Sequence, residues 1–243
     1  ATTEEHRQRI VNLIKDYRIL LGQGVVARFD TETYSDAVAF ARIGEGSLGG
    51  KARGLAFMNS MLLKHRQYDK HDNLRIMIPR SVVIATDYFD EFIRNNGLKY
   101  IISQEFSDEE ILSEFVSSTI PVKLQRELKA YIKTVSTPLA VRSSSKLEDS
   151  HYQPFAGIYS TYMIPYTEGN EDRQLRLLQK AIKSVYASTY FAASKAYVQS
   201  SQNLIAEEKM AVVIQEVCGT EQDGLFFPTL SGVARSINYY PIG

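Results

Sequence analysis

The chain has 243 residues, of which 44% are apolar and 23% are charged, a composition typical of a globular protein with a sizeable core. Basic and acidic residues number 28 each, and the zero net charge argues against a dedicated nucleic-acid-binding protein. No apolar run approaches the roughly 18 residues that a membrane span needs, and the charged N-terminus lacks the apolar core of a signal peptide. The single cysteine, Cys218, excludes an intrachain disulfide, and we expect a cytoplasmic location.

The first 24 residues predict a helix that is distinct from the rest of the chain. Thr2 and Glu5 have the spacing of a capping box, and Gly22 ends the pattern. Between them, apolar residues recur at helical spacing: Ile10, Val11, Ile14, Tyr17 and Leu21. We therefore expect an N-terminal helix or linker over residues 1–24 and a domain over residues 25–243.

Helical and strand patterns alternate along this domain. Helices are predicted over residues 51–65 and 86–97, from Ser107 (with Glu110 completing a capping box), from Pro121, and over residues 170–199. Strands are predicted over residues 74–79 and 81–86 (a pair, or one strand broken at Pro79), 138–144, 155–164 and 209–218, with a final pair within 224–240. This interleaving predicts an α+β (mixed α/β) fold.

A glycine-rich stretch, "IGEGSLGGKARGL", precedes the first helix of the domain and contains one lysine, Lys51. Such a stretch is typical of a backbone that approaches a phosphate closely. The P-loop pattern fails twice, because Glu45 stands where its first glycine should be and Ala52 stands where its hydroxyl should be. The protein-kinase pattern fails as well, because Lys51 occupies the position of its valine.

The dinucleotide pattern G-x-G-x-x-G is matched by Gly44, Gly46 and Gly49. Alone it is a weak signal, because it also needs a preceding strand and an acidic residue that ends a second strand about 20 residues later. Asp69 and Asp72 lie near that distance but precede the next predicted strand. A nicotinamide-dependent oxidoreductase therefore remains only a rival hypothesis.

Two later segments carry polar groups in apolar surroundings. Arg142 ends the apolar run "LAV" and is followed by three serines, and its guanidinium suits a phosphate that serine hydroxyls and loop amides could help to hold. Gln215 is the lone amide in the apolar run "AVVIQEV", and a side-chain amide there can read an adenine edge.

Each of these residues also has a purely structural interpretation. Lys51 can be a solvated lysine, Arg142 can pair with Glu148 or Asp149, and Gln215 can bond to the backbone of the sheet. The two acidic residues after Arg142 are more typical of a solvated loop than of a catalytic or metal site. In the same way, we expect His151 to be exposed and Cys218 to be a buried strand residue.

Several segments in a fixed order resemble the N-terminal nucleotide-binding domain of the phosphoenolpyruvate synthase and pyruvate phosphate dikinase family. They are "GGKARGL", "LAVRSSSKLEDSHYQPFAGIYSTY" and "MAVVIQEV…SGVARS…YP", and the resemblance covers about residues 40–240. The chain departs from the family pattern at Ala52 and Ser145, where glycine and alanine are common, and in the "NYYP" region.

The resemblance implies the first lobe of an ATP-grasp domain, a mixed sheet with flanking helices, with the second lobe absent. It also assigns site residues. Lys51 and Arg142 would be the catalytic residues and would contact the phosphates of ATP. The other nucleotide-contacting positions would be Gly157 and Thr161, against the nucleotide, and Gln215 with the backbone of Glu216 and Val217, around the adenine.

In this family the reaction is a phosphoryl transfer that depends on ATP and Mg²⁺. The resemblance implies that the full-length protein is a phosphotransferase. A swivelling phosphohistidine domain would receive the phosphoryl group and pass it to an acceptor domain that binds pyruvate or a similar acceptor. We predict no metal ligands, nucleic acid or membrane for this chain, and no catalysis by it alone. The alternative is a non-catalytic nucleotide-sensing or interaction module of the same fold.

Overall fold

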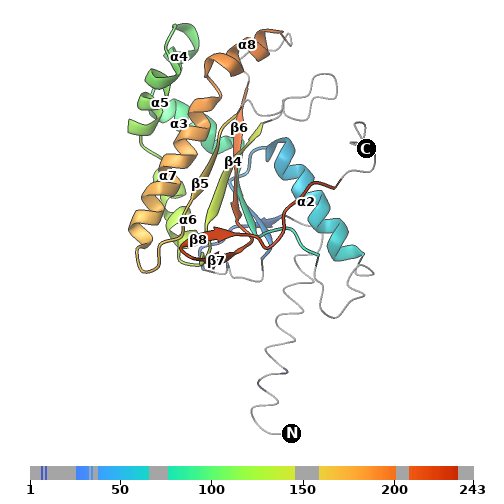
Figure 1. Ribbon diagram of the computed structural model, residues 1–243. Coiled ribbons are helices and arrows are strands. Elements are labelled where there is room, and N and C mark those ends of the chain that lie inside the picture. Colours follow the sequence, from blue (N-terminus) through green and yellow to red (C-terminus); the bar gives the residue numbers. More distant parts are fainter. Residues whose placement is uncertain are drawn as a thin grey trace.

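The computed structural model describes residues 7, 9, 26–32, 34, 38–65, 76–145, 159–200 and 208–234. Within them, six strands form one sheet in the order β1-β2-β3-β6-β4-β5 (Figure 1). The strands are β1 (Ala27–Arg28), β2 (Phe40–Ile43), β3 (Ser81–Ile84), β4 (Leu139–Ser145), β5 (Thr161–Ile164) and β6 (Met210–Glu216). The first three are parallel to one another, and every other pairing is antiparallel. The sheet is thus mixed, as the sequence predicts.

Strand β6 is the central strand because its side chains are apolar on both faces of the sheet. Residues 210–214 are all buried, and β6 pairs with β3 on one side and with β4 on the other. A strand that is buried on both faces has a continuous run of apolar residues, and "MAVVI" is such a run. This position sets which residues of β3, β4 and β6 can meet.

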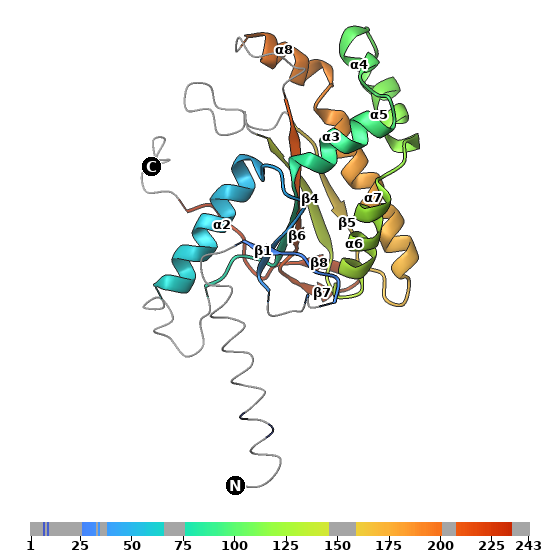
Figure 2. The ribbon, with the colours of Figure 1, turned by 180° about the vertical axis from the view of Figure 1, so that it is seen from behind.

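Helices cover one face of the sheet and enclose the main core. They are α3 (Thr86–Asn95), α5 (Asp108–Ser117), α6 (Val122–Ile132) and α7 (Glu171–Ser188), and they lie together on one side of the sheet in Figures 1 and 2. The short helix α4 (Tyr100–Ser103) and helix α8 (Ala192–Ser200) extend this layer. Val82, Val141 and Ile214 point from the sheet into this core, and each is fully buried.

The opposite face carries a single described helix, α2 (Gly49–Lys64), as Figure 2 shows from behind. Ala52 of α2 packs there on a small cluster that includes Phe40, Val83 and Val213. The C-terminal half of α2 leaves Phe57 and other apolar side chains exposed. Among the described residues, one face of the sheet is therefore a core, and the other is only partly covered.

Several element predictions are confirmed and others are wrong. The capping box of Ser107 and Glu110 begins α5, and α6 follows Pro121, which is its N-cap rather than a first-turn residue. Residues 76–80 form no strand, because Pro79 cannot donate to a ladder. The predicted helix over residues 1–24 lies outside the described residues, apart from two isolated positions.

The long helix predicted over residues 170–199 is in fact two helices. α7 ends at Ser188 and α8 begins at Ala192, whose amide donates to Asp108 Oδ1 at 2.8 Å. A carboxylate at the start of a helix satisfies one of its unpaired amide groups. Because Asp108 belongs to α5, this break depends on a contact between distant parts of the chain.

The end of the described chain also differs from the prediction. β7 (Thr220–Gln222) and β8 (Leu225–Phe227) form a hairpin across Asp223 and Gly224, both with positive φ, so the final pair begins earlier than predicted. β6 ends at Glu216, two residues before Cys218. Cys218 is consequently exposed rather than buried in a strand.

Candidate functional site

The partly covered face of the sheet carries a row of polar side chains. In the register of the sheet, Ser81 lies opposite Gln215, Ala140 lies opposite Gln215 on the other side, and Arg142 lies opposite Thr161. Side chains directly opposite one another point to the same face, as do residues two apart along a strand. Three positions predicted from the sequence, Arg142, Thr161 and Gln215, therefore share one face.

Hydrogen bonds link the members of this row. Arg142 Nη1 donates to Gln215 Oε1 at 3.5 Å, and Gln215 Nε2 donates to Ser81 Oγ at 3.2 Å. Ser81 Oγ in turn donates to the carbonyl of Pro79 at 2.8 Å. The partners of Gln215 are thus two side chains and not the backbone of the sheet, and its amide orientation is fixed by them.

Lys51 lies in the first turn of α2 and reaches the end of β4. Its Nζ donates to Ser143 Oγ at 3.1 Å, and Ser143 directly follows Arg142 in the sequence. Lys51 therefore contacts the residue next to Arg142 in β4, although successive side chains of a strand point to opposite faces of the sheet. In addition, α2 has no acidic residue in its first turn, so its N-terminus is suited to an anion.

Of the three serines that follow Arg142, the first two lie in the strand that the sequence predicts, and Ser145 extends β4 by one residue; all three are fully buried. Ser144 Oγ accepts from the Ala52 amide at 3.0 Å and donates to the Leu48 carbonyl at 2.8 Å. Both hydrogen-bonding roles of this hydroxyl are thus used to attach the start of α2 to the sheet. Ser144 therefore helps to hold the helix in place.

Gly49 makes this attachment sterically feasible. Its φ is +70°, and a Cβ built there would lie 1.8 Å from the carbonyl oxygen of Ser144. No side chain can occupy that position unless the backbone of β4 moves. The glycine is therefore required for the approach of α2 to the strand that carries Arg142.

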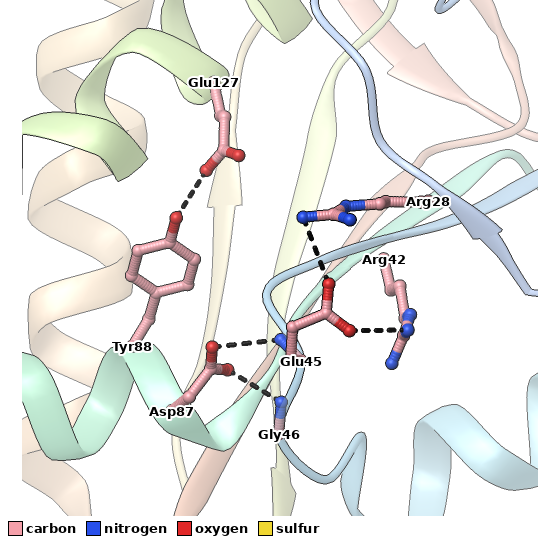
Figure 3. A network of polar contacts seen from close by, with 7 residues as sticks. All are labelled: Arg28, Arg42, Glu45, Gly46, Asp87, Tyr88 and Glu127. Atoms are coloured by element: carbon pink, nitrogen blue, oxygen red, sulfur yellow. Dashed lines mark hydrogen bonds and ion pairs between the residues drawn. The ribbon is translucent and has the colours of Figure 1, made fainter.

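The preceding loop, residues 44–47, is held by the start of α3 (Figure 3). The two carboxylate oxygens of Asp87 accept hydrogen bonds from the amides of Glu45 and Gly46, each at 3.0 Å. Thr86 Oγ1 accepts from the Ser47 amide at 3.0 Å, and the Thr86 amide donates to the Ser47 carbonyl at 3.0 Å. These loop amides already have protein acceptors.

This arrangement argues against the dinucleotide hypothesis, although its topology is present. The parallel strands β2 and β3 are joined through α2, and β2 directly precedes the glycines. However, a Cβ at Gly44 would lie 2.5 Å from Asp87 Oδ1, and one at Gly46 would lie 2.6 Å from the Asp87 amide. The space beside these glycines contains an acidic side chain, which would repel a pyrophosphate.

Ion pairs and a buried phenol surround the loop (Figure 3). The Glu45 carboxylate pairs with Arg28 at 3.2 Å and with Arg42 at 2.8 Å, which ties the loop to β1 and β2. Tyr88 donates to Glu127 Oε2 at 2.7 Å. Burial, and then this bond to a carboxylate, raise the pKa of the Tyr88 phenol, so it stays protonated and links α3 to α6.

Two other predicted positions have internal partners, and one cannot be placed. The Glu216 carboxylate pairs with Arg80, and its amide donates to the Arg80 carbonyl at 2.9 Å. The Val217 amide donates to the Pro138 carbonyl at 2.9 Å. Gly157 lies outside the described residues, as do Glu148, Asp149 and His151.

The sequence interpretation missed the residues that hold the loop. Asp87 and Thr86 were seen only as the start of a helix, and Ser81 only as the start of a strand. The signal was present in Gly44 and Gly46, because closely spaced glycines indicate that some group approaches the backbone. Nothing in the sequence says that this group comes from the protein itself.

The described residues contain no cluster of three or more histidine, cysteine, aspartate or glutamate side chains that could hold a metal ion. The partners observed for Lys51 and Arg142 are one hydroxyl and one amide, and neither is a carboxylate oxygen of the kind that Mg²⁺ prefers. Among the helices of the described part, none has the length and apolar character to cross a bilayer.

Comparison with known proteins matches residues 45–241 to the pyruvate phosphate dikinase, AMP/ATP-binding domain family. The match begins in the glycine-rich loop. It includes Lys51 and the strands β4 and β6, which carry Arg142 and Gln215. It covers far more than half of the chain.

Two curated relatives match most of the chain. The chain is 30% identical over 199 residues to the uncharacterized phosphotransferase YvkC of Bacillus subtilis (strain 168), covering 79% of the chain and 20% of that protein. It is 28% identical over 202 residues to phosphoenolpyruvate synthase of Aeropyrum pernix, covering 74% of the chain and 22% of that protein. The chain thus spans about a fifth of the length of these relatives. By the match over residues 45–241, the chain belongs to the pyruvate phosphate dikinase AMP/ATP-binding domain family.

Proposed function

We propose that this chain forms the first lobe of an ATP-grasp domain and binds the phosphates of ATP with Lys51 and Arg142. The observation that carries the proposal is the hydrogen bond from Lys51 Nζ to Ser143 Oγ, the residue next to Arg142 in β4. If ATP binds between α2 and β4, a lysine, an arginine and a helix N-terminus can together neutralise its phosphates.

The rest of the polar row is suited to the remainder of the nucleotide. Gln215 presents an amide on the same face of the sheet, and Thr161 lies directly across from Arg142. To contact an adenine edge, Gln215 would exchange its bond to Arg142 or to Ser81 for one to the base. If the bond to Arg142 is the one exchanged, the guanidinium would also be released toward the phosphates, because Arg142 and Gln215 now bond to each other.

In the full-length protein, we propose that this domain supplies a phosphoryl group to a histidine on a swivelling domain, and thence to pyruvate or a similar acceptor. Phosphoryl transfer depends mainly on positioning and on charge neutralisation, which a lysine and an arginine can provide. Among the described residues, no cluster of three or more acidic, histidine or cysteine side chains could hold Mg²⁺. By itself, the chain is expected not to catalyse phosphoryl transfer.

The proposal is tested by titrating ATP, with Mg²⁺, into the full-length protein and measuring the dissociation constant by calorimetry. Lys51→Ala and Arg142→Ala are each expected to weaken binding at least tenfold, or about 1.4 kcal/mol, because each removes a charge-assisted bond to phosphate. Lys64→Ala, in the exposed last turn of α2, is the control and should leave binding unchanged. Wild-type affinity in both test variants would refute the proposed phosphate grip.

A further inference from the structure

One carboxylate holds the loop that leads into α2. Asp87 accepts from two successive amides, those of Glu45 and Gly46, with one oxygen for each. Only a side chain with two acceptor atoms can do this, and an ionised carboxylate accepts more strongly than a neutral group. Asp87 also lies in the first turn of α3, where the helix dipole favours negative charge.

The loop is shaped to admit this carboxylate. Gly44 has φ +93°, and any Cβ there would collide with the Asp87 side chain. A Cβ at Gly46 would meet both the Asp87 amide and Thr86 Oγ1, at 2.6 and 2.7 Å. Two glycines and one acidic residue therefore fit together as a single unit.

This unit connects directly to the start of the helix that carries Lys51. The Gly49 amide donates to Ser47 Oγ at 3.3 Å, and Ser47 is itself bonded to Thr86 through both its amide and its carbonyl. On its other side, the first turn of α2 is attached to Ser144. The first turn is thus fixed from two directions, by α3 and by β4.

From these contacts we propose that Asp87 is a positioning residue for Lys51. This inference rests on the proposed ATP site. Asp87 need not touch the nucleotide. By holding residues 45 and 46, it fixes where α2 begins and therefore where the Lys51 ammonium lies relative to Arg142. A binding group works only if its support holds it within a fraction of an ångström of its position.

The test compares the ATP affinity of the full-length protein with that of Asp87→Asn, Lys51→Ala and the double variant. Asn keeps the size of the side chain but replaces one acceptor oxygen with a donor that faces an amide. We expect Asp87→Asn to weaken ATP binding about five- to tenfold. In the double variant the loss should exceed that of Lys51→Ala by less than twofold, because Asp87 acts through Lys51.

The matched control is Asp90→Asn, which removes a charge from the same helix. Asp90 pairs with Lys209 at 2.5 Å and does not bond to the loop in any contact of the described residues. It should leave ATP affinity unchanged. Melting temperatures of all variants without nucleotide report any general loss of stability. If Asp87→Asn does not fold, Thr86→Val takes its place, since it removes the acceptor for the Ser47 amide at similar volume.

The outcomes separate this inference from the proposed function. Wild-type affinity in Asp87→Asn, with Lys51→Ala weakened, overturns the positioning role alone. Losses that multiply in the double variant overturn it too, because Asp87 would then act independently of Lys51. Wild-type affinity in Lys51→Ala and Arg142→Ala overturns the proposed function, and this inference with it.

Discussion

At the scale of single residues, Gly44, Gly46 and Gly49 each leave room for another part of the protein. Gly44 and Gly46 leave room for Asp87, whereas Gly49 leaves room for the backbone of β4 at Ser144. Their G-x-G-x-x-G spacing coincides with a dinucleotide pattern, but the groups that fill the space belong to the protein. The spacing therefore follows from internal packing and not from a bound pyrophosphate.

The requirement at Gly49 gives a prediction about stability. Gly49→Ala would place a methyl group against a backbone carbonyl in a left-handed conformation, and we expect it to lower the free energy of unfolding by at least about 4 kcal/mol. Gly54→Ala, with nothing within 4 Å of its added Cβ in the exposed middle of α2, should instead raise it by about 0.5–1 kcal/mol. Urea unfolding followed by circular dichroism measures both changes, and equal effects would contradict this account.

At the scale of elements, helix starts are where the sequence is most informative. The capping box of α5 is complete, because the Ser107 hydroxyl accepts from the Glu110 amide and the Glu110 carboxylate accepts from the Ser107 amide at 2.8 Å. Both partners lie within one turn, so local spacing is enough to identify them. By contrast, α8 begins where Asp108 of α5 accepts its first amide, and no local pattern announces that.

The capping box predicts a pH dependence. Hydrogen bonds from the backbone and then the hydroxyl of Ser107 lower the pKa of Glu110 from its ordinary 4.5. A carboxyl whose pKa is lowered in the folded state stabilises the fold above its ordinary pKa, and this contribution is lost as the pH falls through the lower, folded value. Glu110→Gln should therefore flatten the fall in stability on acidification below about pH 4.5.

Chemical denaturation at a series of acidic pH values measures this slope. Glu109→Gln is the control, since Glu109 is an exposed neighbour on the same helix and does not occupy the capping position. A slope that changes equally in the two variants would show that the overall loss of charge, and not the cap, is responsible.

At the scale of the whole molecule, the two faces of the sheet differ in what they carry. Helices α3, α5, α6 and α7 lie on one face and α2 lies on the other (Figure 1). The first face is a continuous core, and the second carries the polar side chains of Ser81, Arg142, Thr161 and Gln215. This division lets the core fix the strands while polar groups remain available on the opposite face. The hairpin of β7 and β8 forms a separate two-stranded sheet.

Hydrogen exchange should reveal this organisation. The amides of Ala211–Ile214 in β6 are buried between two neighbouring strands, and we expect them to exchange most slowly. The amides of the β7–β8 hairpin should exchange much faster, because its residues are mostly exposed and an isolated two-stranded sheet is marginal. Mass spectrometry after proteolysis measures the exchange of both segments. Similar protection of β6 and of the β7–β8 hairpin would contradict this organisation.

The sequence by itself determined the features whose cause is local. The apolar run of β6, the capping box of α5 and the helix after the glycines all follow from side chains within a few residues of one another. The ordered segments also identified the family correctly. The mixed fold is confirmed for the same reason, since alternating helix and strand patterns are each legible over short windows.

Only the tertiary structure decided which groups meet. The Asp87 bond to Gly46 spans 41 residues, that of Arg142 to Gln215 spans 73, and that of Ser144 to Ala52 spans 92. A pattern of residue types shows that a glycine must be approached or that a buried arginine needs a partner, but it does not name the partner. The partner is set by the register of the strands. Burial of the apolar face of the sheet fixes this register, and the register fixes which polar groups lie side by side on the opposite face.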